Sequence, residues 1–192
     1  MSSTTPVYEN LDRENFESWF PAIIEPLYET RAAGFAVAML TFPLFERYVR
    51  QKVGLRADET VDDRFLGELI KLIPGLADVA QARQFWTACR HGLLHQATVQ
   101  IRNSKGQLLP RFALTHDIPQ VVQEHDGVFF MQPVLFAKRI IELIRADFAT
   151  YYGQPAAPPL PRVEAMTIYG VAPNQSTATV STTPYILGTG AR

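Results

Sequence analysis

The sequence predicts a mainly α-helical bundle with a β-hairpin insertion and a proline-, serine- and threonine-rich C-terminal tail. Three observations favour this fold class. Apolar residues recur at helical spacing over most of residues 15–152. The pattern changes to strict alternation within residues 98–115, and the composition shifts again after Gly153. We therefore predict a helical domain over residues 1–152, with the hairpin at about 98–115, and a linker with a flexible tail or small β appendage over 153–192.

Two helical regions are expected first along the chain. Residues 15–29 have apolar side chains at helical spacing, but Pro21 and Pro26 favour kinks or short pieces. Residues 31–53 form the strongest helix candidate, and Gly54 is suited to end it.

Two further helices are expected before the hairpin. Residues 58–72 show helical spacing and are followed by Pro74-Gly75, which ends the third helix. Asp78 is a good N-cap for a fourth helix, which we expect to continue to about Gln96.

The hairpin and the last helix complete the domain. Residues 98–102 and 111–115 both alternate between apolar and polar side chains, and Gly106 closes the four-residue loop after the first of them. Asp126-Gly127 marks another turn, and residues 131–152 are expected to form the last helix.

The composition restricts the classes of function and location. The net charge is −1, which argues against simple charge-driven nucleic-acid binding. Cys89 is the single cysteine, so no intramolecular disulfide can form. Residues 1–15 lack the basic and apolar regions of a signal peptide, and the longest apolar run, residues 32–45, is shorter than the ~20 residues that span a bilayer. These features predict a cytoplasmic protein outside the membrane.

One segment of the chain carries only positive charge. No acidic residue stands between Asp78 and Asp117, whereas the interval contains five basic residues: Arg83, Arg90, Arg102, Lys105 and Arg111. This pattern favours an anionic ligand such as phosphate. The alternative is that acidic residues from other helices neutralise the segment.

The sequence FWTACRHGLLHQA, residues 85–97, combines an apolar stripe with a polar side. On an α-helix the stripe contains Phe85, Trp86, Cys89 and Leu93. Arg90 lies at its flank, and His91 and His95 stack on the opposite side. Gly92 costs a helix about 1 kcal/mol relative to alanine, and close approach of another backbone is one reason to tolerate it. The polar side is therefore predicted to meet a partner.

The run Arg90-His91-Gly92-Leu93-Leu94-His95 resembles the motif of the HEPN superfamily. In that motif an arginine is followed by a polar residue, usually Asn, Asp or His, and then by a histidine. The preceding helices are similar to that family's short bundle, and the resemblance covers roughly residues 31–152, with the hairpin as an insertion.

The resemblance implies a metal-independent endoribonuclease without a cofactor, often a toxin or an antiviral effector. Two copies would face each other as a homodimer and form a composite cleft. Arg90 would stabilise the phosphate charge, His95 would move protons, and His91 would support them. We expect the RNA to contact four further basic residues: Arg83, Arg102, Lys105 and Arg111.

Three alternatives stay open beside this reading. The resemblance also implies a second possibility, since many members of the family are non-catalytic RNA- or nucleotide-binding modules, or partners of a nucleotidyltransferase antitoxin. A zinc hydrolase could use His91 and His95, with a third ligand among His116, Asp117 and His125, but the intervening residues lack the glutamate of an H-E-x-x-H motif. The motif could also make only surface or dimer contacts.

Other residues have simpler interpretations. Cys89 on the apolar stripe is expected to be a small buried side chain rather than a nucleophile. Arg47, Arg50 and Lys52 are expected to form the solvated end of the second helix.

Overall fold

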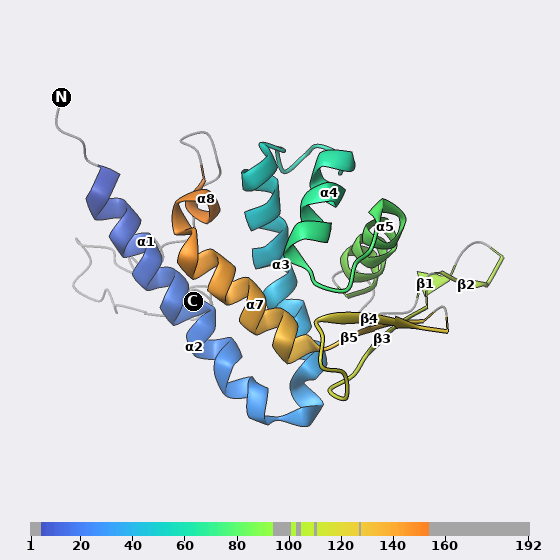
Figure 1. Ribbon diagram of the computed structural model, residues 1–192. Helices are drawn as coiled ribbons and strands as arrows, with labels where there is room; N and C mark the ends of the chain where they lie inside the picture. Colours follow the sequence, from blue (N-terminus) through green and yellow to red (C-terminus); the bar gives the residue numbers. More distant parts are fainter. Residues whose placement is uncertain (1–4, 94–100, 103–104, 110, 127, 154–192) are drawn as a thin grey trace, which may run out of the picture. The chain divides into compact units, whose positions relative to one another are not determined.

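The computed structural model describes residues 5–93, 101–102, 105–109, 111–126 and 128–153 (Figure 1). The chain divides into two units. In the first, Met1–Phe16 with Pro158–Arg192, the described residues belong to the helix α1, Thr5–Trp19. The second unit, Glu17–Ala157, contains the remaining described elements. The predicted tail after Gly153 lies outside the described residues.

The region before the long central helix is helical but broken, as the prolines predict, although the first helix begins at Thr5 and not at the predicted residue 15. After α1 come α2 (Pro21–Ile24) and two 3₁₀ turns, η1 (Glu25–Glu29) and η2 (Arg31–Ala33). Pro21 and Pro26 each stand in the first turn of a piece, where a missing N–H costs nothing.

The long helix α3, Gly34–Val53, is the centre of the second unit. It ends as predicted at Gly54, whose backbone is left-handed at φ 68° and whose N–H bonds to carbonyls of the last turn. It packs against the helices α4, α7 and α8, so its sides are covered by segments far apart in the sequence. Phe42 and Phe45 are fully buried, and both rings contact Phe136 of α7.

Helix α4, Asp63–Leu72, begins later than predicted. Asp62 is its N-cap and accepts a hydrogen bond from the Phe65 N–H at 3.1 Å. The carbonyls of Arg56 and Glu59 instead accept hydrogen bonds from the Arg50 guanidinium of α3. Because these contacts with the preceding helix hold residues 56–59 in a turn, α4 begins only after it.

Helix α5, Val79–Thr87, begins at the predicted cap: Asp78 accepts from the Gln81 N–H at 2.8 Å. Beyond Thr87 the backbone widens into a π-helical turn, η3, Ala88–Leu93. The residues predicted to continue the helix after Leu93 lie outside the described part of the chain.

Gly75 fixes the turn between α4 and α5. Its φ is +102°, and a Cβ at this position would lie 1.8 Å from the Val122 carbonyl oxygen. A glycine is therefore required both by the backbone conformation and by the close approach of strand β4. The turn directs α5 back along α4, against which it packs.

The β structure differs from the single predicted hairpin. Strands β1 (Ile101–Arg102) and β2 (Leu108–Leu109) do pair antiparallel around Gly106. The strand β3 (Arg111–Leu114), however, does not pair with β1, the described end of the first predicted hairpin strand. It runs parallel to β5 (Val128–Met131), which also pairs antiparallel with β4 (Val122–His125) around the predicted turn at Asp126.

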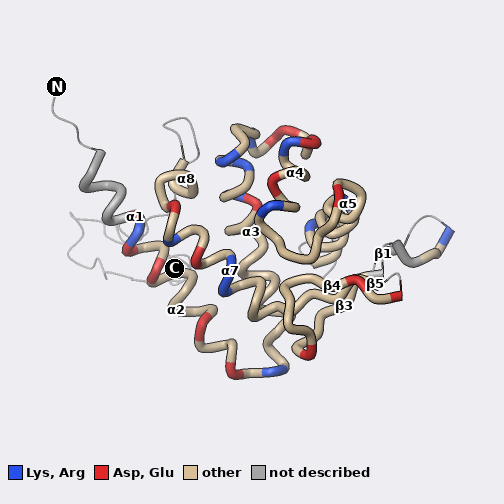
Figure 2. Tube along the Cα trace, viewed as in Figure 1, with Lys and Arg blue, Asp and Glu red and all other residues tan. Residues whose placement is uncertain are grey.

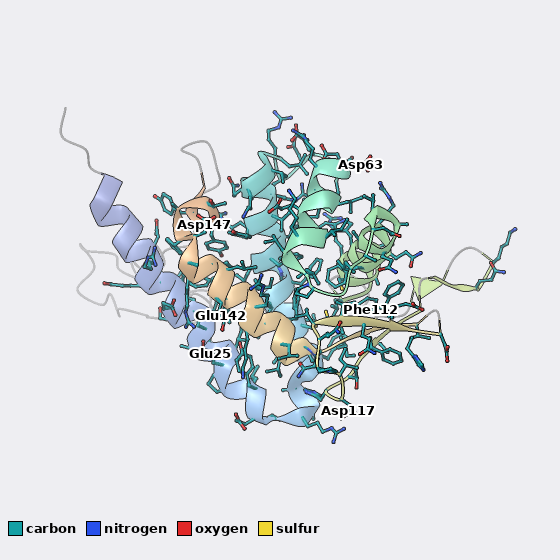
Figure 3. The ribbon with its side chains drawn as sticks, in the orientation of Figure 1. Glu25, Asp63, Phe112, Asp117, Glu142 and Asp147 are labelled. Atoms are coloured by element: carbon teal, nitrogen blue, oxygen red, sulfur yellow. The ribbon has the colours of Figure 1, made fainter. Side chains whose placement is uncertain are left out.

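The reason for the different pairing is burial of Phe112. Its ring lies 6.2 Å from that of Phe129 on β5 and 5.7 Å from that of Phe85 on α5 (Figure 3). The parallel pairing thus places an aromatic residue of β3 in the core, which a short exposed hairpin would leave in solvent.

The last predicted helix is divided in two and begins later than expected. Met131 belongs to β5, and Gln132 caps α7 (Pro133–Ala146) by accepting from the Leu135 N–H. Asp147 interrupts the helix before α8 (Phe148–Tyr152). No helix in the described ranges combines the length and apolarity needed to cross a bilayer.

Candidate functional site

The segment that carries the predicted motif is anchored in the core on its apolar side. Phe85, Cys89 and Leu93 are fully buried, as the stripe predicts, and η3 packs against α3. Burial raises the pKa of the Cys89 thiol, which keeps it protonated. The expectation that Cys89 is no nucleophile is therefore supported by its environment.

The π-helical turn changes the geometry of the motif. Its backbone hydrogen bonds span five residues instead of four, so the regular helical projection does not apply after Thr87. Gly92 is buried within the single chain. The side chain of His91 and all of His95 lie outside the described residues, so their stacking stays a prediction.

Arg90 is half-buried at the edge of this turn. Its Nε lies 3.5 Å from Oε1 of Glu46 on α3, and its guanidinium lies 6.0 Å from the centre of the Trp86 ring. The same Glu46 oxygen accepts a shorter hydrogen bond, 2.8 Å, from Nε of Arg50. One carboxylate is thus shared by two guanidiniums, and the closer contact belongs to Arg50.

Arg50 is the buried member of this network. It also donates to the carbonyls of Arg56 and Glu59, at 2.8 and 3.1 Å, and its guanidinium faces the Phe65 ring. The sequence-based expectation of a solvated basic cluster at the end of α3 is wrong for this residue, which is 6% exposed. Packing of α4 against α3 brings these partners to it.

The other two residues of that basic cluster also have partners. Arg47 donates to the carbonyls of Tyr151 and Tyr152, which closes the C-terminal end of α8. Lys52 lies 3.5 Å from a carboxylate oxygen of Glu68 and donates to the Tyr48 hydroxyl. The cluster therefore ties α3 to α4 and α8.

A pocket of about 400 Å³ opens beside Arg90. One side is formed by α5, through Arg83, Trp86 and Thr87, and the other by the loop of residues 57–61 that precedes α4. Arg50 and Arg90 line the same pocket. The structure therefore brings together Arg83 and Arg90, two of the residues predicted to contact RNA.

The other predicted RNA contacts lie on different elements. Lys105 is exposed at the turn of the β1–β2 hairpin (Figure 2) and is not part of the pocket lining. Arg102 belongs to β1 and Arg111 to β3, and the side chains of both lie outside the described set. These three assignments stay predictions.

Acidic residues from other helices reach the basic segment. Asp63 of α4 pairs with Arg83 at 3.0 Å, and Glu46 of α3 pairs with Arg90. Both pairs support the alternative that the fold neutralises part of the charge. The Arg83 pair is highly exposed, however, with 56% and 82% of the two side chains accessible, so it contributes little to stability.

The histidines of the sheet region have local roles. Nε2 of His116 lies 3.0 Å from the Arg31 carbonyl oxygen, and the neighbouring Asp117 pairs with the Arg31 guanidinium. His125 is exposed beside Asp126. Among the residues that the structure describes, no group of three or more His, Cys, Asp or Glu side chains is placed to hold a metal ion. The zinc alternative depends on His91 and His95 and stays untested.

Sequence reasoning missed the acidic half of the site. Glu46 and Arg50 are four residues apart on one helix, a spacing typical of ion pairs, and this was the one available signal. The contribution of residues 57–61 depends on a turn that Arg50 holds in place, so no local pattern marks it.

Comparison with known proteins identifies no relative: no protein-family model, no curated protein and no solved structure matches this chain.

Proposed function

We propose that this chain is a metal-independent endoribonuclease of the HEPN type, which acts as a homodimer in the cytoplasm. The observation that supports the proposal is the position of Arg90. The first residue of the motif is half-exposed on a π-helical turn, beside a pocket that also contains Arg83. π-Helical turns occur frequently at functional sites.

In the proposed reaction, the 2′-hydroxyl oxygen of RNA attacks the neighbouring phosphorus atom. His95 accepts the hydroxyl proton as the P–O bond forms, because imidazole titrates near neutral pH. The bond from phosphorus to the 5′-oxygen breaks, and the His95 of the second copy donates a proton to that oxygen. The products are a 2′,3′-cyclic phosphate and a 5′-hydroxyl. Arg90 stabilises the charge that builds on the phosphate oxygens, and His91 positions the phosphate.

The pairing of Glu46 favours a role of this kind for Arg90. If a phosphate draws Arg90 away, the Glu46 carboxylate keeps its shorter contact with the buried Arg50 and is not left unpaired. Arg90 can therefore exchange partners at low cost.

A second candidate is a binding module without catalysis, for RNA, a nucleotide or an antitoxin-like partner protein. The ion pair between Arg90 and Glu46 favours it as well, since a guanidinium that already has a carboxylate partner can serve packing alone. The two candidates differ in whether RNA is cut.

The test is cleavage of a mixed RNA substrate in EDTA, with wild type, His95→Ala and Arg90→Ala compared at matched dimer content. We expect 2′,3′-cyclic phosphate ends and a loss of rate of about 100-fold or more in both variants. His125→Ala and Arg64→Ala are matched controls, because both side chains are exposed and neither lines the pocket. Absence of cleavage, or cleavage indifferent to both motif substitutions, would reject the catalytic assignment in favour of the binding module.

A further inference from the structure

The pocket beside Arg90 has two walls of opposite charge. Arg83 and Thr87 lie on α5, and Arg90 lies in the turn η3 that follows it, so this first wall presents two guanidiniums and a hydroxyl. The second wall, formed by the loop, presents Asp58, Glu59 and Thr60. An occupant that fits both walls carries an anion at one end and hydrogen-bond donors at the other.

The two guanidiniums of the first wall can turn to a ligand. The pair of Arg83 with Asp63 is exposed to solvent, where ion pairs contribute between nothing and about 1 kcal/mol. Arg90 contacts Glu46 at 3.5 Å, while Arg50 holds that carboxylate at 2.8 Å. Binding of a phosphate between Arg83 and Arg90 therefore leaves no buried charge unpaired.

Hydrogen bonds to the backbone hold the turn that forms the second wall. Arg50 binds the carbonyls of Arg56 and Glu59, and the Glu59 carboxylate accepts from the Arg56 N–H at 2.7 Å. The carbonyl and the carboxylate of Glu59 therefore both have partners within the turn or on α3. Asp58 makes an exposed ion pair with Arg56 at 3.4 Å, so its carboxylate can accept from hydroxyl or amino groups of a ligand.

We propose that this pocket binds one nucleotide. Its phosphate lies between Arg83 and Arg90, and its sugar hydroxyls or base amino group donate to Asp58 and Thr60. A pocket of about 400 Å³ is large enough for a small-molecule ligand, for which ~300–1,000 Å³ is usual. A bare phosphate ion would fill little of that volume and would place its charge opposite Asp58. Identification of the nucleotide as part of an RNA strand rests on the proposed function, whereas binding of a free nucleotide does not.

The experiment measures binding of the four nucleoside 5′-monophosphates, each separately, and of inorganic phosphate, in EDTA. Isothermal calorimetry gives the affinities. Fluorescence of Trp86, in a Trp19→Phe background, reports occupancy because the Trp86 ring lines the pocket and contacts Arg90. We expect saturable binding of at least one nucleotide, tighter than that of phosphate.

Three substitutions distinguish the contributions of the two walls to the binding affinity. Arg83→Gln should weaken nucleotide and phosphate alike, roughly tenfold, because it removes a charge-assisted contact to the shared group. Asp58→Asn and Thr60→Val should weaken the nucleotide several-fold and leave phosphate unchanged or tighter. Arg64→Gln and Asp117→Asn are the matched controls and should change neither affinity, since both replace exposed, ion-paired residues away from the pocket lining.

Two results would overturn the inference. One is the absence of saturable nucleotide binding to the wild-type chain. The other is an increase in both affinities by the same factor in Asp58→Asn, which would mean that the carboxylate only repels anions. Nucleotide binding with this pattern in a chain that cuts no RNA would reject the proposed ribonuclease and keep the pocket. Cleavage of RNA by a chain that binds no free nucleotide would reject the pocket and keep the proposed ribonuclease.

Discussion

Arg90 and Arg145 each border a pocket of about 400 Å³, but their ion pairs differ in kind. Arg145 of α7 donates to both carboxylate oxygens of Glu17, at distances down to 2.6 Å, and pairs with Glu25 at 2.9 Å. Hydrogen bonding to Glu17 raises the pKa of its guanidinium. Arg90 instead lies 3.5 Å from a carboxylate that belongs mainly to another arginine.

The difference separates a structural arginine from a candidate ligand contact. Arg145 holds the carboxylates of Glu17 and Glu25 closely, and Glu25 and Glu142 lie at the same pocket between η1 and α7 (Figure 3). The carboxylate beside Arg90 does not depend on Arg90, because Arg50 already binds it. An arginine with a shared, longer contact can change partners with less loss than one that holds two acids closely.

The largest expected effect comes from breaking the buried end of the Glu46 network. Arg50→Ala leaves Glu46 and the carbonyls of Arg56 and Glu59 without their main donor. We expect a loss of about 3 kcal/mol in the free energy of unfolding, measured by urea denaturation. Arg64→Ala, an exposed arginine of α4, is the control and should change stability by less than about 0.5 kcal/mol. Equal effects of the two substitutions would show that Arg50 does not hold the loop.

Substitution of each part-exposed arginine, Arg145 and Arg90, tests whether their ion pairs differ in strength. Arg145→Ala should cost about 1 kcal/mol after allowance for solvent screening, because two carboxylates lose a close partner. Arg90→Ala should cost roughly half as much or less, because Glu46 keeps Arg50. The same urea measurements decide the order, and a larger cost at Arg90 would contradict its assignment as an exchangeable contact.

The smallest effect is expected at Tyr28, beside Arg145. Its hydroxyl oxygen is buried and has no hydrogen-bond partner among the described residues, so Tyr28→Phe should change stability at pH 7 by less than about 0.5 kcal/mol. Burial, helped by Glu25, raises the pKa of Tyr28 to about 12.

The raised pKa gives the Tyr28 prediction a pH dependence. Above about pH 10 the unfolded chain loses this phenolic proton while the folded chain keeps it, so stability falls as the pH rises. Urea unfolding at pH 8 and pH 11 should therefore show a smaller alkaline loss in Tyr28→Phe than in wild type. An identical alkaline loss in both proteins would count against burial of the hydroxyl.

Much of the fold was predictable because local chemistry determines it. The caps at Asp78 and Gly54 each depend on hydrogen bonds to residues a few positions away, and the apolar stripe of α5 follows from helical spacing. Of the site, the motif arginine Arg90 and the neighbouring Arg83 were identified from charge pattern and resemblance. The pairing of β3 was not predictable from alternation, since the choice of partner depended on where Phe112 finds an apolar surface.

The sequence by itself determined the helical class, the helix ends at Gly54 and Asp78 and the concentration of positive charge in one segment, because these depend on residue type and short spacing. The tertiary structure decided which charges meet. Packing of η3 against α3 brings Arg90 to the Glu46 carboxylate that Arg50 of the same helix already binds, and the turn that Arg50 holds supplies the acidic wall of the pocket. The contact of Arg90 with Glu46 joins positions far apart in the chain, and its geometry follows from how the helices bury their apolar sides.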